Sequence, residues 1–194
     1  MRARLRAMTP LLPTPASVRT ATGSLAHRDG LPLVLAPGAT DPDFTAARAL
    51  RDSLRRVCGL ELTIEGHARS SGLGPRIELR REGNEGDAYR LRVTPECVEA
   101  AGAGPAGLRY AVETLSQLVS PSGRIPACEI EDAPDFQLRG LMLDVSRGKV
   151  PTQDCVKELI DVCVRLKLNV LMLYTEHTFR FRRHPEIGAD DSPL

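Results

Sequence analysis

The chain has 194 residues, 42% of them hydrophobic, which is enough to bury a core in one large domain or two small ones. Lys and Arg number 26 against 25 Asp and Glu, so the net charge is +1, and no basic surface for nucleic acid or an anionic membrane is indicated. No apolar run approaches transmembrane length, and Leu11-Leu12 is too short for the apolar core of a signal peptide. We expect a globular protein that binds neither nucleic acid nor membrane, cytoplasmic by default, although a start codon placed wrongly upstream would hide an export signal.

The N-terminal region predicts a short strand and a helix after a loose beginning. Residues 1–25 are rich in Pro, Ser and Thr, which is typical of a flexible lead-in. Residues 31–36 form an apolar stretch of strand length. A helix is then expected from Asp41, a candidate N-cap followed by Pro42, to Gly59, which is placed for a left-handed C-terminal cap.

Apolar residues alternate with charged ones in the following segments, which predicts strands with one face in water. A second helix is expected over residues 107–119, with one apolar face. We therefore predict that residues 26–132 form an α+β domain, in which two helices cover the inner face of an antiparallel sheet. The alternating segments are residues 60–64, 77–79, 89–93 and 98–100.

The C-terminal region, residues 133–194, predicts a βαβ unit. The strand at 136–145 has an uninterrupted apolar centre, which is typical of a strand buried on both faces. Pro151 and the candidate N-cap Thr152 begin an amphipathic helix, and a second apolar strand follows at 169–174. Two apolar strands joined by one helix are expected to run parallel.

Charged residues follow both of these strands, and the carboxyl ends of parallel strands are where barrels and open α/β sheets hold their functional groups. Arg147 follows the first strand, and its guanidinium could donate to two neighbouring hydroxyls or pair with a loop carboxylate. Asp144 is expected to form a structural ion pair. Glu176 and His177 follow the second strand, either as site residues or as part of a solvated loop.

Several other patterns compete with this interpretation. Residues 102–107 spell GxGxxG before a helix, but the strand before them carries Glu96 and Glu99, whereas a dinucleotide-binding strand is buried on both sides. The spacing of His177 and His184 fits no metal motif, so no metal site is expected. The five cysteines are scattered, and we expect them to be reduced and structural, without a disulfide. A carbohydrate-binding module would need stacking aromatics, yet the chain has no Trp. A non-catalytic scaffold is the remaining alternative.

Several segments of the chain resemble glycoside hydrolase family 20, the β-N-acetylhexosaminidases. The resemblance covers most of residues 30–187, and the two C-terminal segments are its most specific part. The segments are Ala88 to Pro95, Gly107 to Leu118 with its Thr-Leu-x-Gln-Leu signature, the linker Ile125 to Pro134, Arg139 to Arg147, and Lys167 to Val170.

This resemblance implies a small α+β domain followed by the first βαβ of a (β/α)8 TIM barrel, truncated here. It implies retaining hydrolysis of a glycan with a terminal N-acetylhexosamine, in which the substrate's own acetamide oxygen attacks the anomeric carbon, with no metal or organic cofactor. Arg147 matches the family's residue that binds sugar hydroxyls, and Glu176 or His177 takes the first place of an acidic pair that braces the site. The family's usual His after this Arg is Gly148 here.

The resemblance places the catalytic Asp-Glu pair at the end of the fourth barrel strand. A TIM barrel takes about 250 residues, and fewer than sixty follow Phe136. We therefore expect no catalytic residue within this chain, no activity of the chain alone, and a requirement for the rest of the barrel.

Overall fold

A computed structural model describes residues 10–26, 29–66, 74–148, 150–176, 179–188 and 190. The chain divides into two compact units, Met1–Asp135 and Phe136–Leu194. Each unit has its own sheet, of seven strands in the first unit and of two in the second, among the described residues.

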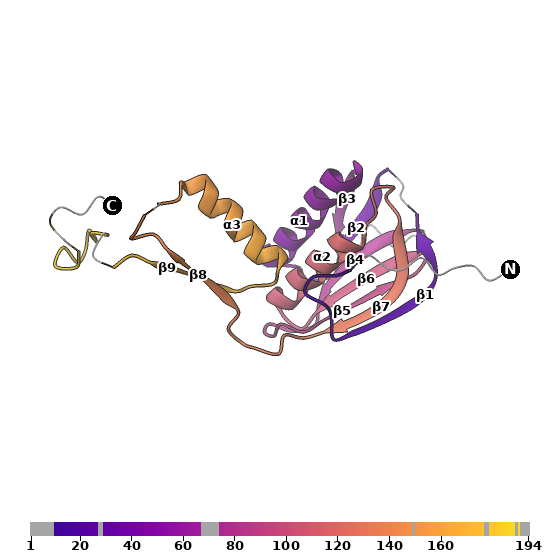
Figure 1. Cartoon of the computed structure of the whole chain (residues 1–194). Coiled ribbons are helices and arrows are strands. Elements are labelled where there is room, and N and C mark those ends of the chain that lie inside the picture. Colours follow the sequence, from indigo (N-terminus) through magenta and orange to yellow (C-terminus); the bar gives the residue numbers. More distant parts are fainter. Residues whose placement is uncertain are drawn as a thin grey trace. The chain divides into compact units, whose positions relative to one another are not determined.

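Within its described residues, the first unit is a seven-stranded sheet with two helices packed against one face (Figure 1). The strand order is β1-β7-β5-β6-β4-β2-β3. The elements are β1 (Ser17–Leu25), β2 (Leu31–Leu35), α1 (Asp41–Cys58), β3 (Leu62–Gly66), β4 (Arg76–Arg81), β5 (Tyr89–Val93), β6 (Cys97–Gly102), α2 (Pro105–Leu118) and β7 (Ile125–Asp132).

The sheet is mixed, so the prediction of an antiparallel sheet is wrong for half of it. Strands β1, β7, β5 and β6 pair antiparallel, whereas β6, β4, β2 and β3 pair parallel. Alternation of apolar and charged residues along a strand indicates that one face is exposed. It does not indicate whether the strand runs parallel or antiparallel to its neighbours. The parallel half exists because α1 carries the chain back from β2, so that β3 enters the sheet beside β2 in the same direction.

The prediction of a loose lead-in is wrong for residues 17–25, which form β1, while residues 1–9 lie outside the described residues. Strand β1 pairs antiparallel with β7, and Ser17 lies opposite Glu131 while Leu25 lies opposite Ile125. Most β1 side chains are exposed, so the strand lacks the apolar alternation from which a strand is predicted. Its order comes from backbone pairing with β7, whose residues are one hundred or more positions away.

The ends of α1 follow the sequence closely. Thr40, rather than Asp41, is the N-cap, and its N–H and Oγ1 donate to Asp43 Oδ2 at 2.7 and 3.0 Å. Gly59 adopts the predicted left-handed conformation, with φ of 72°, and its N–H donates to Arg55 O at 3.0 Å.

The core of the first unit lies between the two helices and the inner face of the sheet. The predicted apolar face of the second helix is confirmed, because its five apolar positions are all buried. Fully buried core side chains include Leu50 and Leu54 of α1, Leu108, Val112 and Leu115 of α2, and Leu33, Ile77, Leu79, Leu91 and Val98 of the sheet.

The second unit contains β8 (Gly140–Asp144), α3 (Gln153–Arg165) and β9 (Val170–Tyr174), and its strands pair parallel as predicted. Thr152 is the N-cap of α3 and accepts from Cys155 N–H at 3.3 Å. Met142 and Met172 are 60% and 54% exposed, so the expected burial on both faces is absent. Among the described residues of this unit, α3 is the only helix that could cover the strand pair.

The starts of β8 and β9 are held together by side chains of the Arg139 and Asn169 segments. Arg139 N–H donates to Asn169 Oδ1 at 2.9 Å, and Asn169 Nδ2 donates to Gln137 O at 2.7 Å. Arg139 Nε also donates to Lys167 O at 3.0 Å. These contacts fix the register of the two strands from the end opposite to the candidate site.

All five cysteines are free thiols. Cys163 is buried on α3, whereas Cys155 on the same helix is exposed. Burial raises the pKa of the Cys97 and Cys128 thiols to about 11.

Candidate functional site

The carboxyl ends of β8 and β9 bring Arg147 and Glu176 together. Asp144 and Tyr174 are register partners at the last positions of the two strands. Arg147 lies three residues beyond Asp144, Glu176 lies two beyond Tyr174, and Arg147 Nη2 forms an ion pair with Glu176 Oε1. The two residues are 29 positions apart in the chain, and α3 and β9 lie between them. The structure therefore unites two of the three residues predicted for the site, while His177 lies outside the described residues.

Asp144 shapes the turn that presents Arg147. Its Oδ1 accepts from Ser146 Oγ at 2.6 Å and from Ser146 N–H at 2.8 Å. The hydrogen bonds from the Ser146 hydroxyl and backbone hold the pKa of Asp144 below its ordinary value. The predicted structural ion pair is thus replaced by a local turn, because the nearest donors to this carboxylate belong to the backbone and hydroxyl two residues on.

Tyr174 joins the site although the sequence analysis did not select it. Its hydroxyl donates to Glu176 Oε1 at 2.9 Å, the oxygen that also receives Arg147. The Arg147 Cζ atom lies 6.0 Å from the centre of the Tyr174 ring, at the outer limit of a cation–π contact. The feature of the sequence that could have indicated Tyr174 is its position, because it is an aromatic residue with a polar hydroxyl at the end of an apolar strand.

Most of the Arg147 side chain is open to solvent, at 65% exposure, whereas Glu176 is 27% exposed. The hydrogen bond to Glu176 and the carboxylate charge raise the pKa of Arg147, so its guanidinium stays charged. Glu176 has a left-handed backbone, with φ of 44°, which is uncommon outside glycine and frequent at functional sites. An exposed guanidinium beside a fixed carboxylate can donate hydrogen bonds to a polar ligand.

An apolar hollow of about 710 Å³ lies beside the same strand ends. Val145 and Thr175, which directly follow β8 and β9, contribute to its lining. Phe179 and Phe181 line it as well, with ring centres 4.6 Å apart in an edge-to-face arrangement. The residues that line this hollow are mostly apolar, and neither Arg147 nor Glu176 is among them.

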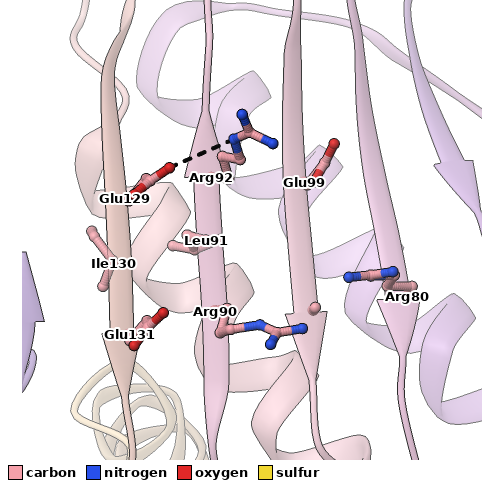
Figure 2. Close-up of a pocket in the computed structure, with 9 residues that line it drawn as sticks. Arg80, Arg90, Leu91, Arg92, Glu99, Glu129, Ile130 and Glu131 are labelled. Carbon is pink, nitrogen blue, oxygen red and sulfur yellow. Dashed lines mark ion pairs between the residues drawn. The ribbon is translucent and has the colours of Figure 1, made fainter. Parts of the chain in front are cut away.

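A second hollow, of about 270 Å³, lies on the sheet face opposite the helices (Figure 2). Arg90 and Arg80 both pair with Glu82, and Arg92 pairs with Glu129 at 3.7 Å. The acidic and basic groups thus neutralise one another, as on a solvated sheet face. The charged residues that line it are Arg80, Arg90, Arg92, Glu99, Glu129 and Glu131.

The GxGxxG segment serves chain packing. A Cβ atom at Gly102 would lie 2.0 Å from Leu108 N, and one at Gly107 would lie 2.2 Å from Ala88 O. Gly107 N–H, in the first turn of α2, donates to Gly86 O at 3.3 Å. The start of α2 is therefore in close contact with the chain's own backbone, where a dinucleotide fold would present the helix N-terminus to a phosphate.

His184 pairs with Glu186 at 3.1 Å. Across the described ranges, no group of three or more His, Cys, Asp and Glu side chains is arranged to hold a metal ion. In the same ranges, no helix is both long and apolar enough to span a bilayer.

Several glycosidases are similar to this chain in sequence or structure. A β-N-acetylhexosaminidase from Cellulomonas fimi is 34% identical over 167 residues, which are 80% of this chain and 34% of the relative. The structure of the Streptomyces plicatus N-acetyl-β-hexosaminidase in complex with Thio-NAglucal matches 92% of this chain and 37% of that protein, with 30% identity and a TM-score of 0.76. A chitobiase structure from Flavobacterium johnsoniae, 20% identical over 95% of this chain and 31% of that protein, shares the fold with a TM-score of 0.79.

The chain thus spans about a third of the length of the relatives that it matches. The family model for domain 2 of glycosyl hydrolase family 20 matches residues 8–133, which is nearly the whole first unit. With its α+β first unit, its parallel βαβ unit and these relatives, the chain belongs to glycosyl hydrolase family 20.

Proposed function

We propose that this chain is the N-terminal portion of a β-N-acetylhexosaminidase-like glycoside hydrolase that removes terminal N-acetylhexosamine from glycans. The first unit would be the small domain that precedes the barrel. The second unit, Phe136–Leu194, would supply the first two strands of a (β/α)8 TIM barrel. The parallel pairing of β8 and β9 and the relatives' names support this assignment.

The observation that carries the proposal is the meeting of Arg147 and Glu176 beyond two adjacent parallel strands. In TIM-barrel enzymes the active site lies at this end of the strands. Arg147 would donate to two neighbouring sugar hydroxyls, and Glu176 would orient its guanidinium. His177, the next residue along, would complete this edge of the pocket.

The chemical step would follow the substrate-assisted route, in which the 2-acetamido oxygen attacks the anomeric carbon and an acid protonates the leaving oxygen. This route needs neither a metal nor an organic cofactor, because the nucleophile belongs to the substrate. The Asp-Glu pair that orients the acetamide and supplies the proton would lie in later barrel strands. The exposed apolar residues of β8 and β9, such as Met142 and Met172, would then be covered by the rest of the barrel.

Two measurements test the proposal. The coding sequence beyond Leu194 is expected to contain an Asp-Glu dipeptide that ends a strand within the roughly 200 residues that complete a barrel. The 194-residue chain is expected to leave p-nitrophenyl N-acetyl-β-glucosaminide intact, while the complete enzyme cleaves it. A complete enzyme inactive on both gluco and galacto N-acetyl substrates contradicts the proposal.

The role of Arg147 is tested in the complete enzyme by Arg147→Ala, with Arg165→Ala as the control. Arg165 lies on α3 and, among the described residues, donates only to a backbone oxygen of its own helix, Asp161 O. Arg147→Ala is expected to raise KM about tenfold or more, since two hydrogen bonds to a charged donor contribute about 1.4 kcal/mol or more. Equal KM values for the two variants would show that Arg147 does not bind the substrate.

A further inference from the structure

We infer that Tyr174 is a positioning residue that holds the Arg147–Glu176 pair in one orientation toward the sugar. This inference rests on the function proposed above. It assigns a role to a residue at the end of β9 that neither the charge pattern nor the family signature selects.

The first support is the sharing of one carboxylate oxygen. Glu176 Oε1 accepts from both Arg147 Nη2 and the Tyr174 hydroxyl. Two donors that converge on one oxygen limit the rotation of the carboxylate, whereas a single donor leaves that rotation open. Because the tyrosine belongs to a regular strand with Asp144 as its register partner, the anchor is fixed to the sheet.

The second support is the place of the ring. Arg147 is 65% exposed, and an exposed ion pair of a long side chain is weakly ordered on its own. The guanidinium lies 6.0 Å from the centre of the Tyr174 ring, so the same side chain contacts both members of the pair. Burial of Tyr174 does not explain how the ion pair is ordered, since Tyr174 is itself 39% exposed.

The charges around Tyr174 give a signature that reports the contact. The hydrogen bond to Glu176 raises the pKa of Tyr174 above its ordinary value of 10.0, with Arg147 acting in the opposite direction. Loss of the carboxylate charge should therefore lower the pKa of Tyr174. A tyrosine that served only to fill space in the strand would not respond in this way.

The contact is tested by tyrosine titration of the 194-residue chain, followed by absorbance. The chain has three tyrosines, so the difference between the wild-type protein and Tyr174→Phe isolates Tyr174. In Glu176→Gln the Tyr174 titration is expected to move to lower pH. An unchanged titration in Glu176→Gln overturns the inference, whatever the enzyme does.

The positioning role is tested by kinetics of the complete enzyme. Tyr174→Phe keeps the ring and is expected to raise KM three- to tenfold with kcat little changed, and Tyr174→Leu should raise KM further. Met172→Leu, in the same strand and on the same face, is the control and should match the wild type. Wild-type kinetics of Tyr174→Phe, or a loss confined to kcat, overturns the inference. An inactive wild-type enzyme contradicts the proposed function instead, and the titration still decides whether Tyr174 holds Glu176.

Discussion

Gln117 and Leu12, which are 105 positions apart, exchange two hydrogen bonds of 2.8 Å. Leu12 N–H donates to Gln117 Oε1, and Gln117 Nε2 donates to Leu12 O. The side-chain amide of α2 thus pairs with a backbone as a neighbouring strand would. This contact holds the segment before β1 in place. The neighbouring Leu11 is buried in the core, with 8% of its surface exposed.

The same helix explains the Thr-Leu-x-Gln-Leu signature at residues 114–118. Thr114 Oγ1 and the Tyr89 hydroxyl lie 2.8 Å apart in the buried interior, which ties α2 to β5. Leu115 and Leu118 fill the core. Each named position of the signature therefore has a separate packing or hydrogen-bonding task.

Gln117→Ala is expected to destabilise the first unit by about 1–2 kcal/mol, because each lost hydrogen bond contributes about 1 kcal/mol. Denaturant unfolding measures this change, and amide exchange at Leu12 should accelerate. Ser116→Ala is the matched control, since within the part of the chain that the structure describes Ser116 donates only to Val112 O of its own helix. Equal amide exchange at Leu12 in both variants would show that the contact does not order the N-terminal segment.

Asp43→Asn is expected to cost about 3 kcal/mol, the scale for breaking a buried ion pair. Arg81 donates to both oxygens of Asp43, at 3.1 and 3.2 Å, and the two side chains are 16% and 5% exposed. The control is Asp41→Asn, an exposed residue in the same helical turn, for which only a small helix-dipole loss is expected.

The loss in Asp43→Asn should depend on pH. Burial raises the pKa of Asp43, but hydrogen bonds from Thr40 and Arg81 outweigh burial, so the pKa lies below its ordinary value of 3.8. The stabilisation is therefore complete above that value and is lost as the pH falls through the lower pKa of the folded state. Unfolding experiments between pH 7 and 2 should show that the difference in free energy of unfolding between wild type and variant becomes smaller only in acid. A gap independent of pH would contradict this account.

Gly102→Ala is expected to cost about 3 kcal/mol or more, because the added methyl would overlap the backbone of Leu108 at 2.0 Å. Gly66→Ala is the control, since no atom of the described residues lies within 4 Å of the added atom. Thermal unfolding of both variants measures the difference. Similar melting temperatures would show that the start of α2 can shift away from β6 without loss.

Asn169→Ala should loosen the β8–β9 register, since Asn169 loses contacts of 2.9 and 2.7 Å with Arg139 N–H and Gln137 O. A loss of about 1–2 kcal/mol is expected for the second unit. Amide exchange of β8 and β9 measures it. Thr152→Ala is the comparison, because it removes only the cap of α3 and should accelerate exchange in the helix first.

Local sequence was sufficient for elements whose causes are local. The end of α1 at Gly59, the N-cap Thr152 and the apolar face of α2 were all predictable, since capping, left-handed glycine and helical periodicity act within a few residues. The parallel βαβ unit was predictable too, because a helix that joins two short apolar strands returns the chain in the same direction.

The tertiary structure alone decided what depends on distant partners. Strand β1 exists through its pairing with β7, and the direction of β4 relative to β6 has no trace in their alternation. At the site, the sequence determined which charged residues follow the strands. That Tyr174 and Arg147 meet on one oxygen of Glu176 depends on the register of β8 against β9. Hydrogen-bond geometry is fixed in three dimensions, whereas the order of residues fixes only which groups are available.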